Sequence, residues 1–512
     1  HGIWMISFIA AAMVAAARAV GAVDAAPRLR RCRAVRVAPA RTWERIGLLA
    51  LVVALLAGFA IYPSFPTYDS VYSLVWGNEI AHLHAPSFDA YRAPTEHPLG
   101  IAVGVLLSPF GDGAGRILEF LILASYAALI AGVYRLCRLA FTPLVGLASA
   151  LILFSRFDFA NLAIRGYIDI PYAAALVWAA ALEHAHPRRG TPVWLLLTAA
   201  GLLRPEAWGL AVLYLIWLAA PAPRQLQARW VLWALAAPAI WLAFDWLATG
   251  DPLFSFHATT QTVGELARSR PPAELPGAAY TFLGELIKPP VIAAALAGLL
   301  LAVWLVPRRA AMPLLILLAG LGTFAVIGAG GLAVIDRYLV LAAVGACLFA
   351  GFAVAGFTVL RRGSRIRTVW AAAAALTAAG VLAFTFANTL RFTSFSDELA
   401  FRTDSHDSLA TVLSSGEVRR RRAAGCGPVS TPTHKLVPDV RLLLDAGEAT
   451  VVSRNDPAAR ARASRGLAVY VHGRRAMDLL GFDADTSALT EVPPAGFERL
   501  AGGKYFTVFG RC

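Results

Sequence analysis

The stretch "IGLLALVVALLAGFAIYPSFPTYDSVY", Ile46 to Tyr72, joins an apolar run to a single carboxylate, Asp69, that is set among aromatic residues. A helix that crosses a bilayer needs about 20 predominantly apolar residues. The run Ile46–Tyr62 therefore predicts a first membrane-spanning helix, and Asp69 follows it at a membrane surface. An acid in this place either caps the next helix or takes part in chemistry, and the rest of the sequence has to distinguish the two.

The composition excludes a water-soluble globular protein. Of 512 residues, 58% are hydrophobic and only 15% are charged, and the mean hydropathy is +0.62. Such a chain is typical of a polytopic α-helical membrane protein. Apolar runs predict about eleven transmembrane helices. These runs lie at 46–62, 115–134, 144–159, 168–184, 193–203, 207–220, 230–248, 291–306, 313–328, 332–360 and 368–388.

The net charge of +14 comes largely from arginines that cluster in short connections between alternate apolar runs. Short cytoplasmic loops retain Lys and Arg, so these connections are predicted to face the cytoplasm, and the charge does not indicate a nucleic-acid partner. The basic connections fall on alternate sides of the membrane only if His97–Gly111 does not cross the bilayer. This segment is therefore predicted to lie in the interface, or to dip into the membrane and return. The loops 63–113 and 250–290 are then extracytoplasmic. The basic connections include Arg135/Arg138, Arg188/Arg189, Arg224/Arg229, Arg308/Arg309 and Arg361/Arg362.

The chain divides into three predicted domains. Residues 1–45 hold an apolar segment and a basic cytoplasmic stretch, and the apolar segment reads as a twelfth helix, a signal-like segment or a product of start-site choice. Residues 46–390 form the transmembrane domain. Residues 391–512 contain short β-like runs between turns and predict a small extracytoplasmic α/β domain. In an oxidising compartment its cysteines, Cys426 and Cys512, could pair as a disulfide, with two unpaired thiols as the alternative.

Charged residues recur at the predicted outer ends of the helices. "RGYIDIPY" places Arg165 and Asp169 at the start of one helix, and "LLRPEAW" places Arg204 and Glu206 at a break between two others. Ionisable groups at such depths are costly unless they are paired or used. Two interpretations stand: structural ion pairs, Arg165–Asp169 and Arg204–Glu206, that hold helix ends, or an outward-facing polar cavity. For Asp69 the corresponding structural interpretation is a helix cap.

Together with the outer C-terminal domain, four motifs resemble the GT-C superfamily of polyprenyl-phosphate-sugar-dependent glycosyltransferases: "TYDSVY", "PTEHPLG", "RGYIDIPY" and "LLRPEAW". This superfamily includes protein O-mannosyltransferases, lipid A aminoarabinose transferase and envelope mannosyl- and arabinosyltransferases. "GNEIAHLHAPSFDAYRAPTEHPL", "TGDPLFSFHATTQTVGELARSR" and "IDRYLVL" resemble a branch in high-GC actinobacteria. The resemblance covers most of 46–388. It implies a GT-C-like fold in the plasma membrane, a polyprenyl-phosphate-linked sugar donor, and an envelope glycan, lipoglycan or protein as acceptor.

The chemistry of such a transfer suggests roles for the outer charges. An acceptor hydroxyl loses a proton as it attacks the anomeric carbon, so one carboxylate acts as general base, and Asp69 is predicted to be that base. The leaving phosphate calls for fixed cations. For Arg337 and His97 a helix anchor and a helix cap are the alternatives. The candidates for binding the donor phosphate and sugar are Arg204, Arg165, Arg337, His97, Asp169 and Glu206, with Glu96, His257 and Arg268 as further loop contacts.

The first outer loop has a single "YD", whereas some GT-C members have a pair of acids at this place. The resemblance therefore does not assign a second catalytic acid beside Asp69. The lack of a D-x-D motif favours a reaction without an obligate metal, with a divalent cation as the alternative. No other cofactor is indicated. A direct displacement with one base predicts inversion at the anomeric carbon, and mannose and arabinofuranose are the main options for the sugar. The competing functions are a transporter or lipid-linked-sugar flippase, which would show midplane charges and half-to-half symmetry, and a non-catalytic envelope scaffold.

Overall fold

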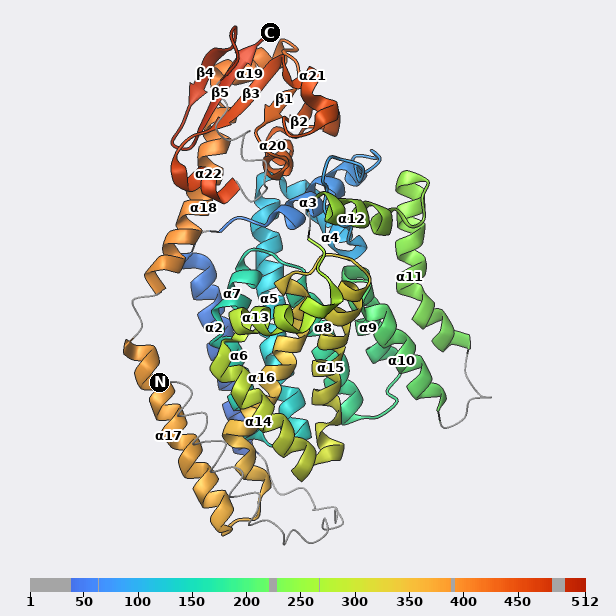
Figure 1. The fold of residues 1–512 in the computed structure, drawn as a ribbon, viewed down its shortest axis with the longest axis vertical. Helices are drawn as coiled ribbons and strands as arrows, with labels where there is room; N and C mark the ends of the chain where they lie inside the picture. The colour runs from blue at the N-terminus through green and yellow to red at the C-terminus, as the bar shows by residue number, and fades with distance from the viewer. Residues whose placement is uncertain (1–37, 63, 221–227, 267, 388–391, 481–492) are drawn as a thin grey trace.

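The computed structural model describes residues 38–62, 64–220, 228–266, 268–387, 392–480 and 493–512. A bundle of helices makes up most of the molecule, and a small sheet domain stands at one end of it (Figure 1). The predicted N-terminal apolar segment, Cys32 and the predicted boundary at 390 lie outside the described residues.

Each predicted span coincides mainly with one α-helix of the structure, although 144–159 also reaches into α7 and 332–360 also holds η4 and η5. Within the described residues, five helices are long and apolar enough to cross a membrane, or up to seven when each of two bent helix pairs counts as one span. This count of five to seven spans is lower than the eleven predicted from the sequence. Several of the predicted spans form helices too short to cross a membrane, or one half of a bent pair. The chain is therefore a polytopic α-helical membrane protein. Its helices are α2 (Ala38–Ile61), α5 (Ala114–Ala140), α6 (Pro143–Phe154), α8 (Asp169–Ala185), α9 (Thr191–Leu203), α10 (Ala207–Ala219), α11 (Ala228–Thr249), α14 (Pro289–Leu305), α15 (Pro307–Ala329), α16 (Val340–Ala355) and α17 (Arg365–Ala387).

The helix α16 lies at the centre of the bundle. Nearly all of its residues are buried, and α14, α15 and α6 pack around it. Helices at the periphery instead expose large apolar side chains, such as Leu49 on α2, Leu232 on α11 and Leu300 on α14. Large exposed apolar surfaces mark a site of membrane or protein interaction, which here is the expected lipid-facing side of the bundle.

The connections at the sheet-domain end of the bundle fold into short helices, including most of the stretch predicted as an open loop at 250–290. Short helices satisfy backbone hydrogen bonds internally, which an open loop at a membrane surface does not. The elements are α3 (Tyr68–Ala81), α4 (Pro98–Leu107), η1 (Ser108–Gly113), α7 (Phe157–Ile164), α12 (Phe254–Glu265), η3 (Pro272–Glu274) and α13 (Leu275–Ile287). Two further 3-10 turns, η4 (Asp336–Leu339) and η5 (Gly356–Val359), flank α16.

The C-terminal part folds into an α/β domain around a five-stranded sheet. The strands lie in the order β2-β1-β3-β5-β4, with β1 parallel to β2 and β3, and with β5 antiparallel to β3 and β4. The strands are β1 (Val429–Thr431), β2 (Val451–Ser453), β3 (Gly466–Val471), β4 (Glu498–Gly502) and β5 (Phe506–Arg511). The other elements are α18 (Phe392–Leu413), α19 (Gly416–Ala423), η7 (His434–Leu436), α20 (Val437–Leu444), η8 (Glu448–Thr450), η9 (Pro457–Ala459), α21 (Arg460–Ala463) and α22 (Arg474–Leu480).

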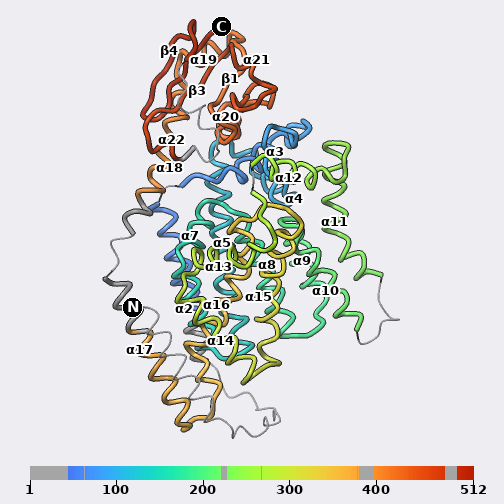
Figure 2. Tube along the Cα trace, in the orientation of Figure 1, coloured from blue at the N-terminus to red at the C-terminus, as the bar shows by residue number. Residues whose placement is uncertain are grey.

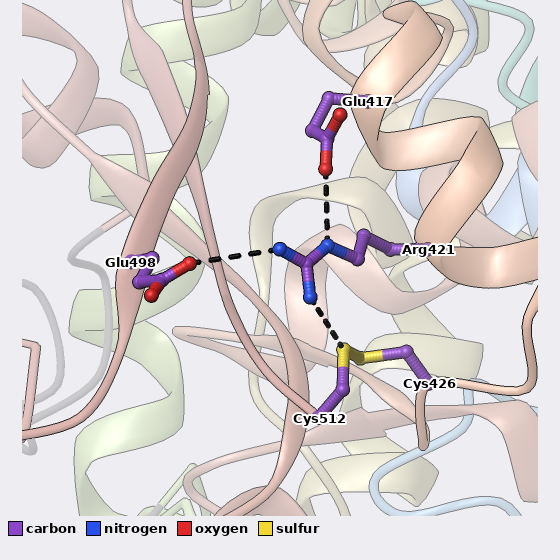
Figure 3. The surroundings of a disulfide bond; sticks show 5 residues. All are labelled: Glu417, Arg421, Cys426, Glu498 and Cys512. Atoms are coloured by element: carbon purple, nitrogen blue, oxygen red, sulfur yellow. Dashed lines mark hydrogen bonds and ion pairs between the residues drawn. A yellow bond between two sulfur atoms is a disulfide. The ribbon is translucent and has the colours of Figure 1, made fainter.

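A disulfide bond joins Cys426, which precedes β1, to Cys512, which follows β5, with the two Cα atoms 5.0 Å apart. Figure 3 shows Arg421 of α19 beside this bond, between the carboxylates of Glu417 and Glu498. One of its Nη atoms lies 3.9 Å from Sγ of Cys512. The disulfide fits a domain in an oxidising compartment.

A buried arginine fixes the sheet domain to the outer helices. Arg441 on α20 has no exposed side-chain surface; it forms an ion pair with Glu79 on α3 and donates to Oγ of Ser87 at 2.8 Å. Nearby, Asn78 donates to Oδ1 of Asp445 at 3.0 Å. A buried charge is tolerated when it is both paired and hydrogen-bonded. The sheet domain is therefore docked on α3, the helix that carries Asp69.

Candidate functional site

The start of α3 places Asp69 at the sheet-domain end of the bundle. The N-cap of α3 is Thr67, whose backbone N–H donates to the carbonyl of Arg165 at 2.9 Å. Ser70 Oγ donates to the carbonyl of Gly166 at 2.7 Å, and Gly166 has a φ of +76°, which glycine adopts readily. Asp69 itself lies in the first turn. The carboxylate of Asp69 is therefore not the cap of α3.

The helix α4 crosses α3 at very close range. A Cβ atom on Gly77 of α3 would lie 2.3 Å from the carbonyl carbon of Gly104 of α4, and a Cβ on Gly104 would lie 2.2 Å from the carbonyl oxygen of Ser73. Only glycine fits at either position without a backbone shift. The two contacts, with those at Arg165 and Gly166, fix α3 and hence Asp69 in place.

Five charged side chains alternate in sign beside α3, and we call this set the charge chain: Asp69, Arg337, Asp169, Arg204 and Glu206. Nη1 of Arg337 lies 2.7 Å from Oδ2 of Asp69 and 3.9 Å from Oδ2 of Asp169. Arg204 pairs with Asp169, and its Nε lies 3.4 Å from Oε1 of Glu206. The structure thus brings five predicted site residues together, and each arginine contacts two carboxylates.

The two structural ion pairs that the sequence allowed have different outcomes. The Arg204–Glu206 pair is present as part of the charge chain. In the described part of the chain no ion pair joins Arg165 to Asp169, because Asp169 contacts Arg204 and Arg337 instead. Arg165 lies over the ring of Tyr167 at 5.4 Å, and Arg337 lies over the same ring at 5.0 Å.

A cavity of about 490 Å³ opens between the bundle and the sheet domain. The cavity is enclosed by segments that lie far apart in the sequence. Its lining includes residues from α3, α12, η4, α18, α20 and β5. Its basic side chains outnumber its carboxylates, since the lining includes Arg92, Arg165, Arg204, Arg268, Arg337, Arg402 and Lys435 against Asp69, Asp169 and Asp439. The cavity therefore suits an anionic ligand.

Asp69 is ionised at neutral pH in this cavity. Burial raises the pKa of its carboxyl group, but the guanidinium of Arg337, which is both close and hydrogen-bonded, outweighs burial and holds the pKa below its usual value of 3.8. An ionised carboxylate can accept a proton from a ligand that reaches the cavity. Arg337 is therefore a partner of Asp69, and not only an anchor of a helix end.

His97 lines the cavity, but it does not act there as a cation. Burial lowers the pKa of its imidazole, and the nearby positive charge of Arg204 lowers it further, to about 4. A neutral imidazole can give or accept a hydrogen bond, and Nδ1 of His97 is buried without a partner among the described residues. A contact of His97 with the donor stays a prediction, in which a neutral imidazole takes part through a hydrogen bond.

The three predicted loop contacts have separate environments. Arg268 lines the cavity. His257 does not line it, and its exposed ring pairs with Asp251 at 2.7 Å; a loop contact of His257 stays a prediction. Glu96 is buried beside the cavity with Oε2 unpartnered among the described residues. Burial raises the pKa of Glu96 to about 8, so its carboxyl group is protonated at neutral pH.

The sequence analysis missed the contribution of the C-terminal part to the cavity. Arg402 and His406 come from α18, His434 and Lys435 come from η7, and Asp439 comes from α20. Burial raises the pKa of Asp439 to about 8, so this carboxyl group is also protonated at neutral pH. The composition of these segments is that of an ordinary soluble domain, and no motif marks them as part of a site.

Comparisons with known proteins bear on the fold. No family model matches the sequence, and no curated protein matches it. Among solved structures, ArnT from Cupriavidus metallidurans bound to undecaprenyl phosphate has a TM-score of 0.56 at 13% identity, over 92% of this chain and 98% of that chain. The oligosaccharyltransferase of Archaeoglobus fulgidus in its apo form has a TM-score of 0.50 at 12% identity, over 92% of this chain and 75% of that chain. The chain has the GT-C fold. This confirms the fold that the four motifs implied, and identities this low show the fold alone.

The GT-C fold of this chain holds carboxylates in its cavity, but they do not converge as metal ligands do. Within the described residues there is no group of three His, Cys, Asp or Glu side chains that could hold a metal ion. In the charge chain an arginine stands between each pair of carboxylates, and a guanidinium competes with a metal for the same oxygens. A reaction without an obligate metal stays a prediction, with a divalent cation as the alternative.

Proposed function

We propose that the chain is a glycosyltransferase that moves a sugar from a polyprenyl-phosphate donor to a hydroxyl group of a cell-envelope acceptor. The observation that supports this most directly is an ionised acid, Asp69, in a large cavity that is otherwise rich in cations. Transfer of a sugar from a phosphate requires a base for the acceptor and fixed cations for the leaving group. We expect the lipid chain to lie along the exposed apolar surface of the bundle.

The proposed reaction is a single displacement. The acceptor hydroxyl hydrogen-bonds to the carboxylate of Asp69, its oxygen attacks the anomeric carbon, and its proton passes to Asp69. The bond between the anomeric carbon and the phosphate oxygen breaks, and its electron pair remains on the phosphate. Arginines of the cavity stabilise the negative charge that grows there. Attack opposite the leaving group inverts the anomeric configuration.

The topology supports a lipid-linked donor. The basic connection between α16 and α17 lies at the end of the molecule farthest from the sheet domain (Figure 2), and the cavity lies beside the sheet domain. If basic connections face the cytoplasm, the cavity and the disulfide-bonded domain face outward from the plasma membrane. Nucleotide sugars are made in the cytoplasm, so an outward-facing site requires a sugar that has crossed the membrane on a lipid. Undecaprenyl phosphate bound to ArnT is an example of such a lipid in this fold.

A transporter or flippase fits the structure less well. Such proteins place charged or broken helices near the membrane midplane. Here the central helix α16 consists of apolar and small residues, and the charge chain lies at the end of the bundle that carries the sheet domain. An envelope scaffold would need no ionised acid in a cationic cavity.

The test is sugar transfer by the purified full-length chain. Mannose and arabinofuranose are offered on a polyprenyl phosphate and, in parallel, as nucleotide sugars, with an envelope glycan, a lipoglycan and a peptide as acceptors. The proposal expects product only from a lipid-linked donor, and a parallel reaction with chelator tests the divalent cation. Product from a nucleotide sugar alone would contradict the proposal. Movement of a fluorescent lipid-linked sugar across vesicles without any transfer would support the flippase.

A further inference from the structure

Four of the basic side chains that line the cavity form two groups that differ in their partners. Arg337 and Arg204 contact the carboxylates of the charge chain, so their charge is compensated within the protein. Arg165 and Arg402 line the same cavity outside that chain. Within the described residues Arg165 has no ion pair, and its Nε is buried without a hydrogen-bond partner. A buried donor left unpaired is costly and indicates a ligand at this place.

Arg402 is also incompletely compensated. Its Nε lies 2.7 Å from Oε1 of Glu398, one turn earlier on α18. The other oxygen of Glu398 lies 3.3 Å from Nη2 of Arg475, so two guanidinium groups share one carboxylate. Burial lowers the pKa of Arg402, and the positive charge of Arg165 lowers it further. Arg165 and Arg402 therefore bring two like charges into the same cavity, close enough for Arg165 to disfavour the charge on Arg402.

We propose that Arg165 and Arg402 together bind the phosphate of the lipid-linked donor, so that α18 of the C-terminal part completes the active site. This inference rests on the proposed function and makes it more specific. A phosphate between the two guanidinium groups removes their mutual repulsion and gives Nε of Arg165 an acceptor. Guanidinium binds phosphate through two parallel hydrogen bonds, and two such groups match the oxygens of one phosphate.

The assignment keeps the base in its active form. A phosphate held mainly by Arg337 would compete with Asp69 for that cation, and burial would then favour the protonated, inactive acid. With the phosphate on Arg165 and Arg402, Arg337 keeps Asp69 ionised while charge grows on the leaving group. The ring of Tyr167, which contacts both Arg165 and Arg337, joins the two sites.

The experiment measures binding of a polyprenyl phosphate to the full-length protein, with the matching polyprenol as the reference without phosphate. Arg402→Gln and Arg165→Gln are each expected to weaken binding of the phosphate by about tenfold or more, because each removes a charged hydrogen-bond donor. Arg402→Lys keeps the charge and is expected to bind more tightly than Arg402→Gln. Inorganic phosphate at equal concentration is expected not to displace the lipid.

The matched control is Arg420→Gln, because Arg420 is an exposed arginine of the C-terminal part that pairs with Glu417 and does not line the cavity. Its binding of polyprenyl phosphate is expected to equal that of the wild type. If wild type binds the phosphate and Arg402→Gln, with an unchanged melting temperature, binds it equally well, this inference is overturned and the proposed function stands. If wild type binds the phosphate no better than the polyprenol, the proposed function fails and the inference fails with it. Displacement by inorganic phosphate at equal concentration would overturn the assignment to a lipid phosphate.

Discussion

Arg337 and Asp69 lie 268 residues apart in the sequence, and Nη1 of Arg337 donates to Oδ2 of Asp69 at 2.7 Å. Asp69 is held by α3, a short helix outside the bundle, whereas Arg337 belongs to η4, which leads directly into the most buried helix, α16. The pair thus connects the proposed base to the core of the protein. It also sets the charge of the base, because Arg337 opposes the effect of burial on the Asp69 carboxyl group.

Replacing Arg337 is expected to change the pH dependence of transfer. In Arg337→Gln, burial is no longer offset by the guanidinium, so the pKa of Asp69 rises. The base is active only when ionised, and the acidic limb of the kcat/KM profile should therefore move to higher pH. Arg337→Lys keeps a positive charge and should move it less. An acidic limb that is the same in Arg337→Gln and wild type would show that this pair does not control the base.

Glu96 is expected to make the stability of the protein depend on pH. Burial raises its pKa from 4.5 to about 8 in the folded protein, so folding favours the protonated form. Stability from this group is complete below pH 4.5 and is lost as the pH rises toward 8. Glu96→Gln resembles the protonated acid and should escape this loss. Melting curves between pH 4.5 and pH 8 should show the variant gaining on wild type as the pH rises, and a constant difference would argue against a raised pKa.

Removing Arg441 is expected to loosen the sheet domain from α3. The side chain is fully buried and pairs with Glu79, and loss of one partner of a buried ion pair costs about 3–5 kcal/mol. Arg441→Gln should lower the melting temperature and make the region between α17 and the sheet domain easier to cleave by protease. The control is Arg420→Gln, because Arg420 is exposed and water screens its pair with Glu417. Equal melting temperatures in the two variants would contradict this account of docking.

The helices could be predicted from the sequence because a long apolar run has few alternatives to a helix in a membrane. The candidate site could be predicted in part: ionisable groups are rare at helix ends in a membrane, so Asp69, Asp169, Arg204 and Arg337 stood out. The partner of Asp169 could not be predicted, because Asp169 has Arg165 near it in sequence and Arg204 near it in space. The charge of His97 depends on burial that only the folded structure supplies.

The contribution of α18 could not be predicted from the sequence either. Arg402 lies in a charged segment of the kind that soluble domains carry on their surface, and nothing in its neighbourhood distinguishes it from Arg475. Only the packing of α18 over the cavity separates the two. The sheet strands were easier to predict, since the β-like run "GLAVYVHG" (466–473) contains β3 and "KYFTVFG" (504–510) covers all of β5 except its last residue. The role of Arg441 in docking was not visible, because its partner Glu79 lies 362 residues away.

The central claim is that Asp69 is the base of a sugar transfer, and the most direct measurement compares wild type with Asp69→Asn. Both proteins are given the same polyprenyl-phosphate sugar and envelope acceptor, and donor binding and melting temperature are measured beside the rate. Asp89→Asn, an exposed acid in the same outer loop that does not line the cavity, serves as the matched control. The account predicts that Asp69→Asn loses about 10²–10⁴-fold in rate while it still folds and binds donor, and that Asp89→Asn keeps the wild-type rate. An Asp69→Asn protein that transfers sugar as fast as wild type would contradict the account.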